Sequence, residues 1–186
     1  MRMDAQMLKP DDFYMEVVSE ESASLFSAFE RFTCGNGEID KYFHESAGRD
    51  PQNVCYVYRN KSNGDIVGLA TLCCSGIIMN DPVLVQLVPA IKIDYFAVSV
   101  DYQDLMFPGS EPGEHFHFSD AFFSELLLCA ANISQDTIGA NFVVLYAVED
   151  AVYFYKRNLF NEFKEYMKRE QYRYLDGCVP MFIRLS

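Results

Sequence analysis

The sequence contains no tryptophan and only three histidines among its 186 residues, and basic side chains are scarce. Fifteen lysines and arginines stand against 27 aspartates and glutamates, which gives a formal net charge of −12. Nucleic-acid phosphates and anionic membranes are bound by basic surfaces. The charge balance therefore argues against a nucleic-acid partner and against a membrane-surface protein.

Long apolar runs are also lacking. No stretch reaches the ~18 residues that a membrane-spanning helix needs. The first residues, MRMDAQMLKPDD, contain no apolar segment typical of an export signal, and they end in an acidic pair. We therefore expect a cytoplasmic protein that does not associate with membranes.

The six cysteines form no CxxC pair, which excludes a zinc ribbon and a thioredoxin-type redox motif. Disulfide frameworks are typical of short secreted chains rather than of a chain this long. Four of the cysteines lie in the apolar runs VCYVY, ATLCCSG and LLLCAA, where a thiol packs as a small hydrophobic group. The pattern favours reduced thiols in a protein core.

Hydrophobic residues make up 50% of the chain, and tyrosine and phenylalanine number 12 and 16. Such a composition argues against intrinsic disorder. A chain of this length buries a core without disulfides or metals, and it corresponds to one domain of ordinary size. We predict a single domain over residues 1–186.

Apolar spacing along the chain predicts alternating strands and helices. Strands are expected over residues 13–18, 54–59, 65–78, 91–100, 141–148, 163–167 and 179–185. Helices are expected from Ser19 or Ser22 toward Arg31, over about 39–47, behind Ser119-Asp120, and over 151–158. Asn63-Gly64 predicts a hairpin turn with positive φ at both residues. Pro82 and Pro89 predict a loop, and residues 101–118 an irregular one. The pattern indicates a mixed α/β sandwich.

Three segments carry a family resemblance: FTCGNGEIDKYFHESA (32–47), IKIDYFAVSVDYQ (91–103) and IGANFVVLYAVEDAVYFYKRNLFNEF (138–163). Together with the final VPMFIRL, they resemble the GNAT superfamily of acyl-CoA N-acyltransferases. Within it they are most similar to the bacterial subgroup that includes acetyltransferase toxins of toxin–antitoxin modules. The resemblance implies one GNAT-like α/β domain. Its mixed, mostly antiparallel sheet is splayed between the fourth and fifth strands, with helices on both faces.

The resemblance also implies an activity, namely N-acetyl transfer from acetyl-CoA to a primary amine of a small molecule or peptide. The backbone of Ala97, Val98 and Val100 is expected to hold pantetheine and polarise the thioester carbonyl. Gln103 begins the pyrophosphate loop. Tyr155 matches the tyrosine of A-x-x-F-Y and is expected to protonate the leaving thiolate, although a tyrosine on a short helix also serves in packing. Members of the family often pair, so a homodimer is implied.

Three positions depart from the family pattern. The motif Q/R-x-x-G-x-G/A fails after Gln103, where Asp104 follows and the segment to the next helix is about a dozen residues longer than the family needs. Val148 replaces the usual asparagine before A-x-x-F-Y, and Leu159 replaces the glycine of the G-F pair. Loop carboxylates would repel a pyrophosphate. Either phosphate is received by the helix that Ser119 begins, or the chain is a non-catalytic binding or regulatory module that has lost normal CoA binding.

Other chemistry is less well supported by the sequence. Asp94 or Glu149 is a candidate base acting through water, but most carboxylates of an acidic chain are solvated. His115 and His117, with Glu114 and Asp120 nearby, lack a fourth ligand at motif spacing, so we predict no metal site. His44 is expected on the surface. A basic cluster near the C-terminus is interpreted as a solvated face; it comprises Lys156, Arg157, Lys164, Lys168, Arg169 and Arg173.

Overall fold

The computed structural model describes residues 9–19, 27–80, 83, 85–111, 113, 115–168 and 175–185. The chain divides into two compact units, each built from two stretches of sequence. Unit 1 comprises residues 1–71 and 95–125, and unit 2 comprises residues 72–94 and 126–186. The prediction of a single domain over 1–186 stays a prediction.

Unit 1 contains β1 (Phe13–Val17), β2 (Val54–Asn60) and α2 (Gly37–Glu45). Strands β3 (Ile66–Asn80) and β4 (Val85–Val98) and helix α3 (Phe118–Ile133) each run through both units. β1 pairs antiparallel with β2, with Phe13 opposite Asn60 and Val17 opposite Tyr56. The strand predicted over 13–18 is confirmed, and so is the helix predicted over about 39–47, which runs from Gly37 to Glu45.

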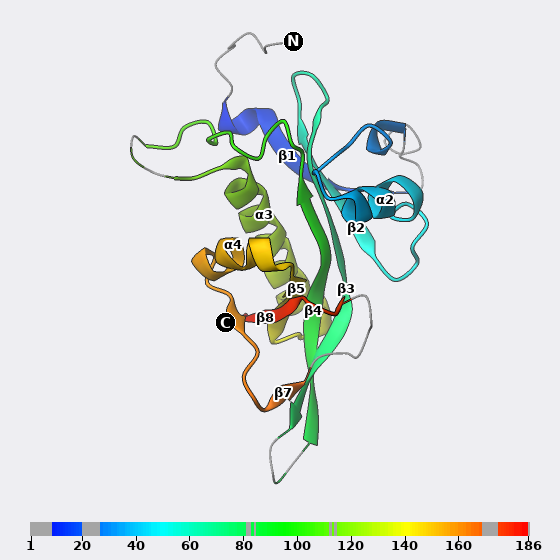
Figure 1. The fold of residues 1–186 in the computed structure, drawn as a ribbon, viewed down its shortest axis with the longest axis vertical. Coiled ribbons are helices and arrows are strands. Elements are labelled where there is room, and N and C mark those ends of the chain that lie inside the picture. Colours follow the sequence, from blue (N-terminus) through cyan, green and yellow to red (C-terminus); the bar gives the residue numbers. More distant parts are fainter. Residues whose placement is uncertain are drawn as a thin grey trace. The chain divides into compact units, whose positions relative to one another are not determined.

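Alternating side chains cover the two faces of the unit 1 strands. On one face Val57, Leu69 and Ala97 form a core with Phe29, Phe32 and Phe43. On the other face, the Tyr58 ring stacks on Phe122 of α3 at 5.1 Å, and Phe96 stacks on the same ring at 5.1 Å. α2 and the first half of α3 thus lie on opposite faces of these strands (Figure 1).

Gly68 explains how closely α3 approaches the strands. A Cβ atom at this position would lie 2.6 Å from the Phe122 ring and 2.9 Å from the Ala97 carbonyl oxygen. Only glycine leaves room for that ring, because overpacking a filled core is destabilising. The contact also shows that the Ala97 carbonyl faces β3.

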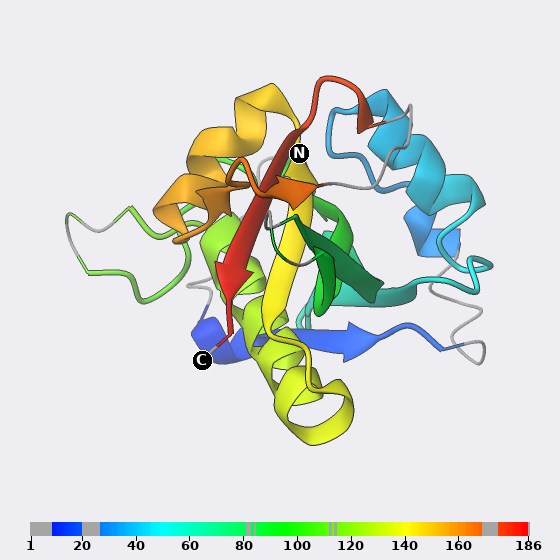
Figure 2. The ribbon, with the colours of Figure 1, turned by 90° about the horizontal axis from the view of Figure 1, so that it is seen from below.

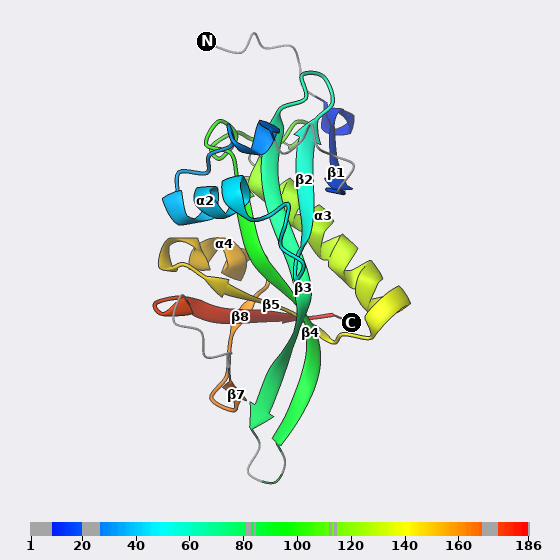
Figure 3. The same cartoon turned by 90° about the vertical axis from the view of Figure 1, so that its right-hand side faces the viewer.

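Unit 2 is built around β5 (Phe142–Ala147) and β8 (Val179–Arg184). They pair antiparallel from Phe142 opposite Arg184 to Ala147 opposite Val179, and they lie side by side in Figure 2. β6 (Asn161–Glu162) extends this pair beside β8. β7 (Met167–Lys168) instead pairs with the far end of β3, as Figure 3 shows.

The sheet order is β1-β2-β3-β4-β5-β8-β6, with β7 beside β3. β4 and β5 pair in parallel from Ala90 opposite Phe142 to Lys92 opposite Val144. Both strands continue past these pairs, β4 to Val98 and β5 to Ala147. The predicted mixed, mostly antiparallel sheet is confirmed. The remaining helical elements are α4 (Val152–Arg157), the 3₁₀ turns Pro10–Asp12 and Glu149–Ala151, and the π-helical end of α3, Ser134–Ile138.

Several local expectations were wrong. Gly64 has φ +75°, but Asn63 does not adopt positive φ; its side chain instead accepts the Asp65 N–H at 2.9 Å and makes a longer turn. Pro89 lies inside β4 rather than in a loop. Its missing N–H is tolerated because β5 pairs only from Ala90 onward.

Two element boundaries were also wrong. Residues 163–166 are not a strand, since only Asn161–Glu162 and Met167–Lys168 pair. α3 begins at Phe118, one residue before the expected Ser119 cap. The cap expected at Ser22 lies outside the described residues.

The cysteines are less buried than the apolar runs suggested. All six are free thiols, but only Cys55 is fully buried, and Cys74 is exposed on β3. Among the helices of the described residues, none is long and apolar enough to cross a membrane.

Candidate functional site

The carboxyl end of β4 presents one backbone edge to β3 and leaves the other edge open. The Tyr95 N–H donates to Thr71 Oγ1 at 3.1 Å, and the Ser99 N–H donates to the Val67 carbonyl at 2.8 Å. Because successive residues of a strand direct their N–H and C=O groups to opposite edges, the backbone groups of Val98 point away from β3. Of the three predicted pantetheine-binding residues in unit 1, Val98 thus directs its N–H to the edge where a ligand could add.

Ala97 and Val100 have fewer backbone groups that could bond to a ligand. The Ala97 backbone faces β3, as the approach of its carbonyl to Gly68 indicates. The Val100 N–H donates to the Thr33 carbonyl at 2.9 Å, so Val100 can offer only its carbonyl to a ligand. Val100 is nevertheless 45% exposed, whereas Ala97 and Val98 are buried.

Gln103 holds two segments of unit 1 together. Its Nε2 donates to the Val98 carbonyl at 2.9 Å and to the Cys34 carbonyl at 2.8 Å. A primary amide has two N–H bonds, so both are used within the protein. The backbone N–H of Gln103 donates to the Ser99 carbonyl at 3.1 Å.

Asp40 fixes the loop that contains Cys34, a role that the sequence analysis missed. Its carboxylate accepts the Thr33 hydroxyl at 2.7 Å and the Cys34 N–H at 2.7 Å. Burial would raise the pKa of Asp40, but these hydrogen bonds outweigh it and hold the pKa below the ordinary value of 3.8. The sequence signal that could have indicated this role is the aspartate in the segment FTCGNGEIDKYFHESA (32–47), six residues after Cys34.

Neither Cys34 nor His44 looks like a reacting group. Burial raises the pKa of the Cys34 thiol to about 11, so it stays neutral and is a poor nucleophile. His44 is on the surface, as expected, and its Nε2 lies 2.7 Å from the Phe32 carbonyl oxygen. That contact requires a proton on Nε2 and gives His44 a structural role.

The long segment 101–118 folds back on itself. Met106 forms a β-bridge with His117, and the Phe107 N–H donates to the Phe116 carbonyl at 2.8 Å. The Phe107 ring packs against Phe13 of β1 at 5.9 Å and against Phe118 at 5.3 Å. The expected irregular loop is therefore closed and anchored within unit 1 by aromatic contacts.

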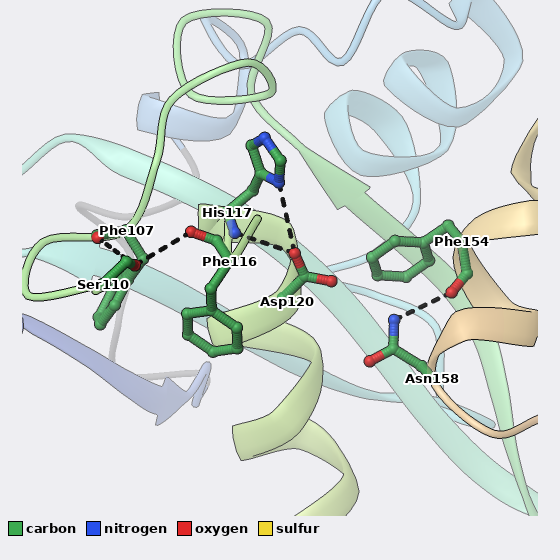
Figure 4. A network of polar contacts seen from close by, with 7 residues as sticks. All are labelled: Phe107, Ser110, Phe116, His117, Asp120, Phe154 and Asn158. Atoms are coloured by element: carbon green, nitrogen blue, oxygen red, sulfur yellow. Dashed lines mark hydrogen bonds and ion pairs between the residues drawn. The ribbon is translucent and has the colours of Figure 1, made fainter. Parts of the chain in front are cut away.

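This closure engages several backbone N–H groups of the segment and of the start of α3. The N–H groups of Tyr102, Leu105, Phe107 and Phe118 all donate to protein carbonyls. At the start of α3, the Asp120 carboxylate accepts the His117 N–H at 2.9 Å and lies 3.6 Å from its Nδ1 (Figure 4). Ser119 is thus inside a helix end that is already capped. That this end receives a phosphate stays a prediction.

His115, unlike His117, is exposed. Glu114 lies outside the described residues. Within the ranges that the structure covers, no group of three or more His, Cys, Asp or Glu side chains could hold a metal ion.

Tyr155 lies on α4 in unit 2 and is only 8% exposed. The helix ends in a Schellman motif. The Phe160 N–H donates to the Tyr155 carbonyl at 3.0 Å, and the Leu159 N–H donates to the Lys156 carbonyl at 3.1 Å. The Phe160 ring packs against the Tyr155 ring at 6.1 Å. The Asn158 amide adds a 2.9 Å bond to the Phe154 carbonyl (Figure 4). The spacing F-Y-x-x-x-L-F therefore encodes a cap that fixes Tyr155.

Leu159 occupies the conformation that the family glycine would adopt. Its φ is +68°, and among the described residues it alone combines a side chain with positive φ. The side chain is 75% exposed, so packing does not stabilise this conformation. The left-handed backbone costs about 1–2 kcal/mol for a residue with a Cβ.

The other candidates in unit 2 are engaged or exposed. Asp94 Oδ1 lies 3.1 Å from Lys92 Nζ in a largely buried ion pair, and Glu149 is exposed in a 3₁₀ turn. Lys156 pairs with Glu162 at 2.6 Å, and the Arg157 guanidinium lies over the Phe154 ring. Arg169 and Arg173 of the basic cluster lie outside the described residues.

Unit 1 also contains a cavity of about 260 Å³ at the end of β4. Its charged lining groups are of both signs, and Tyr102 donates to the Asp65 carboxylate at 3.3 Å. The lining comprises Ala28, Arg31, Phe32, Gly64, Asp65, Ile66, Ser99, Asp101 and Tyr102.

No protein-family model and no curated protein sequence matches the chain. Solved structures match its fold. A bacterial toxin superposes with a TM-score of 0.70 at 19% identity, covering 93% of this chain and 90% of the toxin. The AtaT toxin, a tyrosine-to-phenylalanine variant bound to the C-terminus of the antitoxin AtaR and acetyl-CoA, gives 0.66 at 15% identity over 94% of both chains. AtaT with acetyl-methionyl-tRNAfMet gives 0.64 at 15%, covering 91% and 94%.

These matches show that the chain shares the fold of these toxins, which is the fold that the resemblance of the sequence motifs implied. The structure keeps Val98 and Gln103 together in unit 1 and places Tyr155 in unit 2. The expectation that nucleic acid is not a partner is partly at odds with the neighbours, since AtaT was solved with a tRNA.

Replacement of Leu159 tests the backbone strain at the end of α4. Leu159→Gly should raise the free energy of unfolding by up to about 1 kcal/mol, because glycine adopts the left-handed conformation without the Cβ penalty. Leu159→Ala, which keeps the penalty, should leave stability within about 0.5 kcal/mol. Urea denaturation measures both. A destabilised glycine variant would contradict the assignment.

Replacement of Asp40 tests the anchor of the Cys34 loop. Asp40→Asn should lower stability near pH 7 by about 1–3 kcal/mol, because two hydrogen bonds to a charged acceptor are weakened. Since the folded-state pKa lies below 3.8, the aspartate's contribution is present above that pH and is lost as the pH falls through the folded pKa. The two proteins should therefore converge below pH 3.8 in denaturation curves. An unchanged difference down to pH 2 would contradict the account.

Proposed function

We propose that the protein is an N-acetyltransferase that transfers the acetyl group of acetyl-CoA to a primary amine. The observation that carries this proposal is the shared fold with AtaT, which was solved with acetyl-CoA, over 94% of both chains. Tyrosine-to-phenylalanine variants are known of both AtaT and KacT, which supports a functional tyrosine in such folds.

The reaction forms a C–N bond and breaks a C–S bond. The amine nitrogen attacks the thioester carbonyl carbon, and its excess proton passes to solvent or a base. The carbonyl oxygen gains negative charge, which a backbone N–H stabilises. The C–S bond then breaks, and the CoA thiolate takes up a proton. We assign stabilisation of the carbonyl oxygen to the Val98 N–H, and protonation of the thiolate to the Tyr155 hydroxyl.

Tyr155 suits a proton donor in one respect. Burial raises the pKa of its phenol above the ordinary value of 10.0, so the hydroxyl keeps its proton throughout the neutral range. Because a thiol is ordinarily the stronger acid, the transfer from the phenol is favourable only where burial destabilises the thiolate as well, in a site that excludes water. The buried ring, fixed by Phe160, holds the donor in place.

Unit 1 offers a better binding surface for the pantetheine of acetyl-CoA than for its pyrophosphate. Pantetheine can bond to the open edge of β4 at Val98, as an added strand would. For the pyrophosphate, the N–H groups of Tyr102, Leu105 and Phe107 are engaged within the protein, and Asp104 and Glu111 carry the wrong charge. We therefore expect weaker CoA binding than an intact glycine loop gives, without loss of the thioester end.

For the acceptor we propose the amine of an aminoacyl-tRNA in preference to a small molecule or peptide. AtaT was solved with acetyl-methionyl-tRNAfMet, an acetylated amine of this class. The exposed cations Lys164 and Lys168 supply positive charge in unit 2 despite the acidic composition. An antitoxin-like partner belongs to the same proposal, because AtaT binds AtaR and KacTA was solved with DNA.

A non-catalytic binding or regulatory module remains the second candidate. The engaged N–H groups of segment 101–118 favour it, since they leave few donors for a pyrophosphate. The two candidates differ in one measurable property, the consumption of acetyl-CoA.

Acetyl-CoA use and the role of Tyr155 are tested together. Wild type should release free CoA from acetyl-CoA in the presence of an amine acceptor. Tyr155→Phe should lower kcat about 100- to 10,000-fold while the Kd for acetyl-CoA changes little, because only a proton donor is removed. Tyr153→Phe is the matched control, since Tyr153 lies on the same helix and is 75% exposed. If millimolar acetyl-CoA neither binds to wild type nor is consumed, the module candidate stands instead.

The acceptor class is decided by a competition with radiolabelled acetyl-CoA. Charged tRNA should be acetylated, while deacylated tRNA and a panel of small amines and peptides should not. Binding should weaken as salt rises from about 50 to 200 mM, because phosphate contacts release counterions. Acetylation of small amines at equal or higher kcat/KM would replace the tRNA acceptor with a small-molecule acceptor and leave the acetyltransferase assignment intact.

A further inference from the structure

The cavity of about 260 Å³ in unit 1 combines a buried floor with a charged rim. Phe32, Ser99 and Tyr102 line it and are buried. The charged residues of its lining, all exposed, are Arg31, Asp65 and Asp101. Since an engineered apolar cavity of about 150 Å³ holds benzene, this cavity has room for a small apolar group together with a polar head.

The charges on the rim do not neutralise one another. Arg31 lines the same cavity as Asp65 and Asp101, yet none of the three forms an ion pair within the described residues. Elsewhere in the chain opposite charges do pair, as Lys156 and Glu162 show at 2.6 Å. The guanidinium therefore lies too far from either carboxylate to pair with it, and charges of both signs are available to a ligand.

Hydrogen bonds hold the Asp65 carboxylate in a fixed orientation. Its Oδ2 accepts the Asn63 amide at 2.6 Å and the Tyr102 hydroxyl at 3.3 Å. Burial raises the pKa of Tyr102 above the ordinary value of 10.0, so the hydroxyl keeps the proton that it donates. Within the described residues Oδ1 accepts no hydrogen bond, which leaves it as an acceptor for an N–H group of a ligand.

Ser99 adds a buried donor to the lining. Its Oγ accepts the Asp101 N–H at 3.4 Å, but its own O–H donates to no group in the part of the chain that the structure describes. The residue is only 7% exposed, and a buried hydroxyl without an acceptor costs free energy. A carboxylate would accept hydrogen bonds from this hydroxyl and from the Arg31 guanidinium.

We propose that this cavity binds a small zwitterion of the α-amino-acid class with an apolar side chain. Arg31 and the Ser99 hydroxyl receive its carboxylate. Asp101 and Oδ1 of Asp65 receive its ammonium, and Phe32 contacts its side chain. The site uses none of the groups assigned to acetyl transfer, so it stands independently of the proposed function.

Calorimetric titration of the wild-type chain with each of the twenty free L-amino acids, without acetyl-CoA, tests the site. At least one amino acid with an apolar side chain should bind with a Kd in the micromolar to millimolar range. Two analogues of the tightest binder each lack one charge: the carboxamide lacks the carboxylate, and the N-acetyl derivative lacks the ammonium. Each should bind at least about tenfold more weakly, because charge-assisted hydrogen bonds are lost.

Variants connect each charge of the ligand to its partner. Arg31→Gln should weaken amino-acid binding at least about tenfold and change carboxamide binding less than about twofold, since the carboxamide offers no charge to Arg31. Asp101→Asn should likewise weaken the amino acid and spare the N-acetyl derivative. Arg49→Gln and Asp136→Asn remove exposed charges of the same kinds elsewhere and should change nothing.

Amide chemical shifts locate the bound amino acid. The changes should centre on residues 64–66 and 99–102. Changes centred on other residues, such as those around Tyr155, would overturn the proposal. Failure of all twenty amino acids to bind at millimolar concentration would also overturn it, as would effects of the carboxamide and of Arg31→Gln that simply add. Because acetyl-CoA is left out, these results do not depend on whether the chain transfers acetyl groups.

Discussion

The backbone of β4 after its pairing with β5 ends is the constraint on which the candidate site depends. Parallel pairing covers only Ala90 to Lys92, yet the strand continues to Val98, so its later N–H and C=O groups need other partners. A buried backbone group without a partner costs free energy comparable to a lost hydrogen bond. The Gln103 side chain donates to the Val98 carbonyl, and the Thr33 carbonyl accepts the Val100 N–H. The Val98 N–H lies on that same edge, away from β3.

The order of strands and helices could be predicted because apolar spacing reports which face of an element is buried. The strand over 13–18, the buried strand ending at Val148 and the last strand all lie close to where the pattern put them. Pro89 could not be placed, because a proline is tolerated in a strand wherever its neighbour fails to pair, and pairing depends on distant residues. The strand predicted over 163–167 was wrong over 163–166 for the same reason, because only Met167 at its end found a partner strand, in β3.

At the candidate site, a residue could be singled out from the sequence where a motif encodes the local structure around it. Tyr155 was identified from A-x-x-F-Y, and the Schellman cap at Leu159 and Phe160 explains why the later part of that motif exists. Asp40 was missed because its role depends on hydrogen bonds to Thr33 and Cys34, several residues earlier in a loop. Gln103 was expected at the start of a pyrophosphate loop, and no motif indicated its two carbonyl partners. No spacing in the sequence reveals that the loop at Cys34 lies beside the end of β4.

The left-handed residue at the end of α4 bears on how such chains diverge. A glycine-to-leucine change there costs only about 1–2 kcal/mol, an amount that a stable domain tolerates. The backbone turn, the cap and the packing of Phe160 on Tyr155 all form with leucine at this position. A glycine is therefore a preference of this turn that a folded chain can override at modest cost, and a search for the residue type alone passes over a chain that makes the same turn with another side chain.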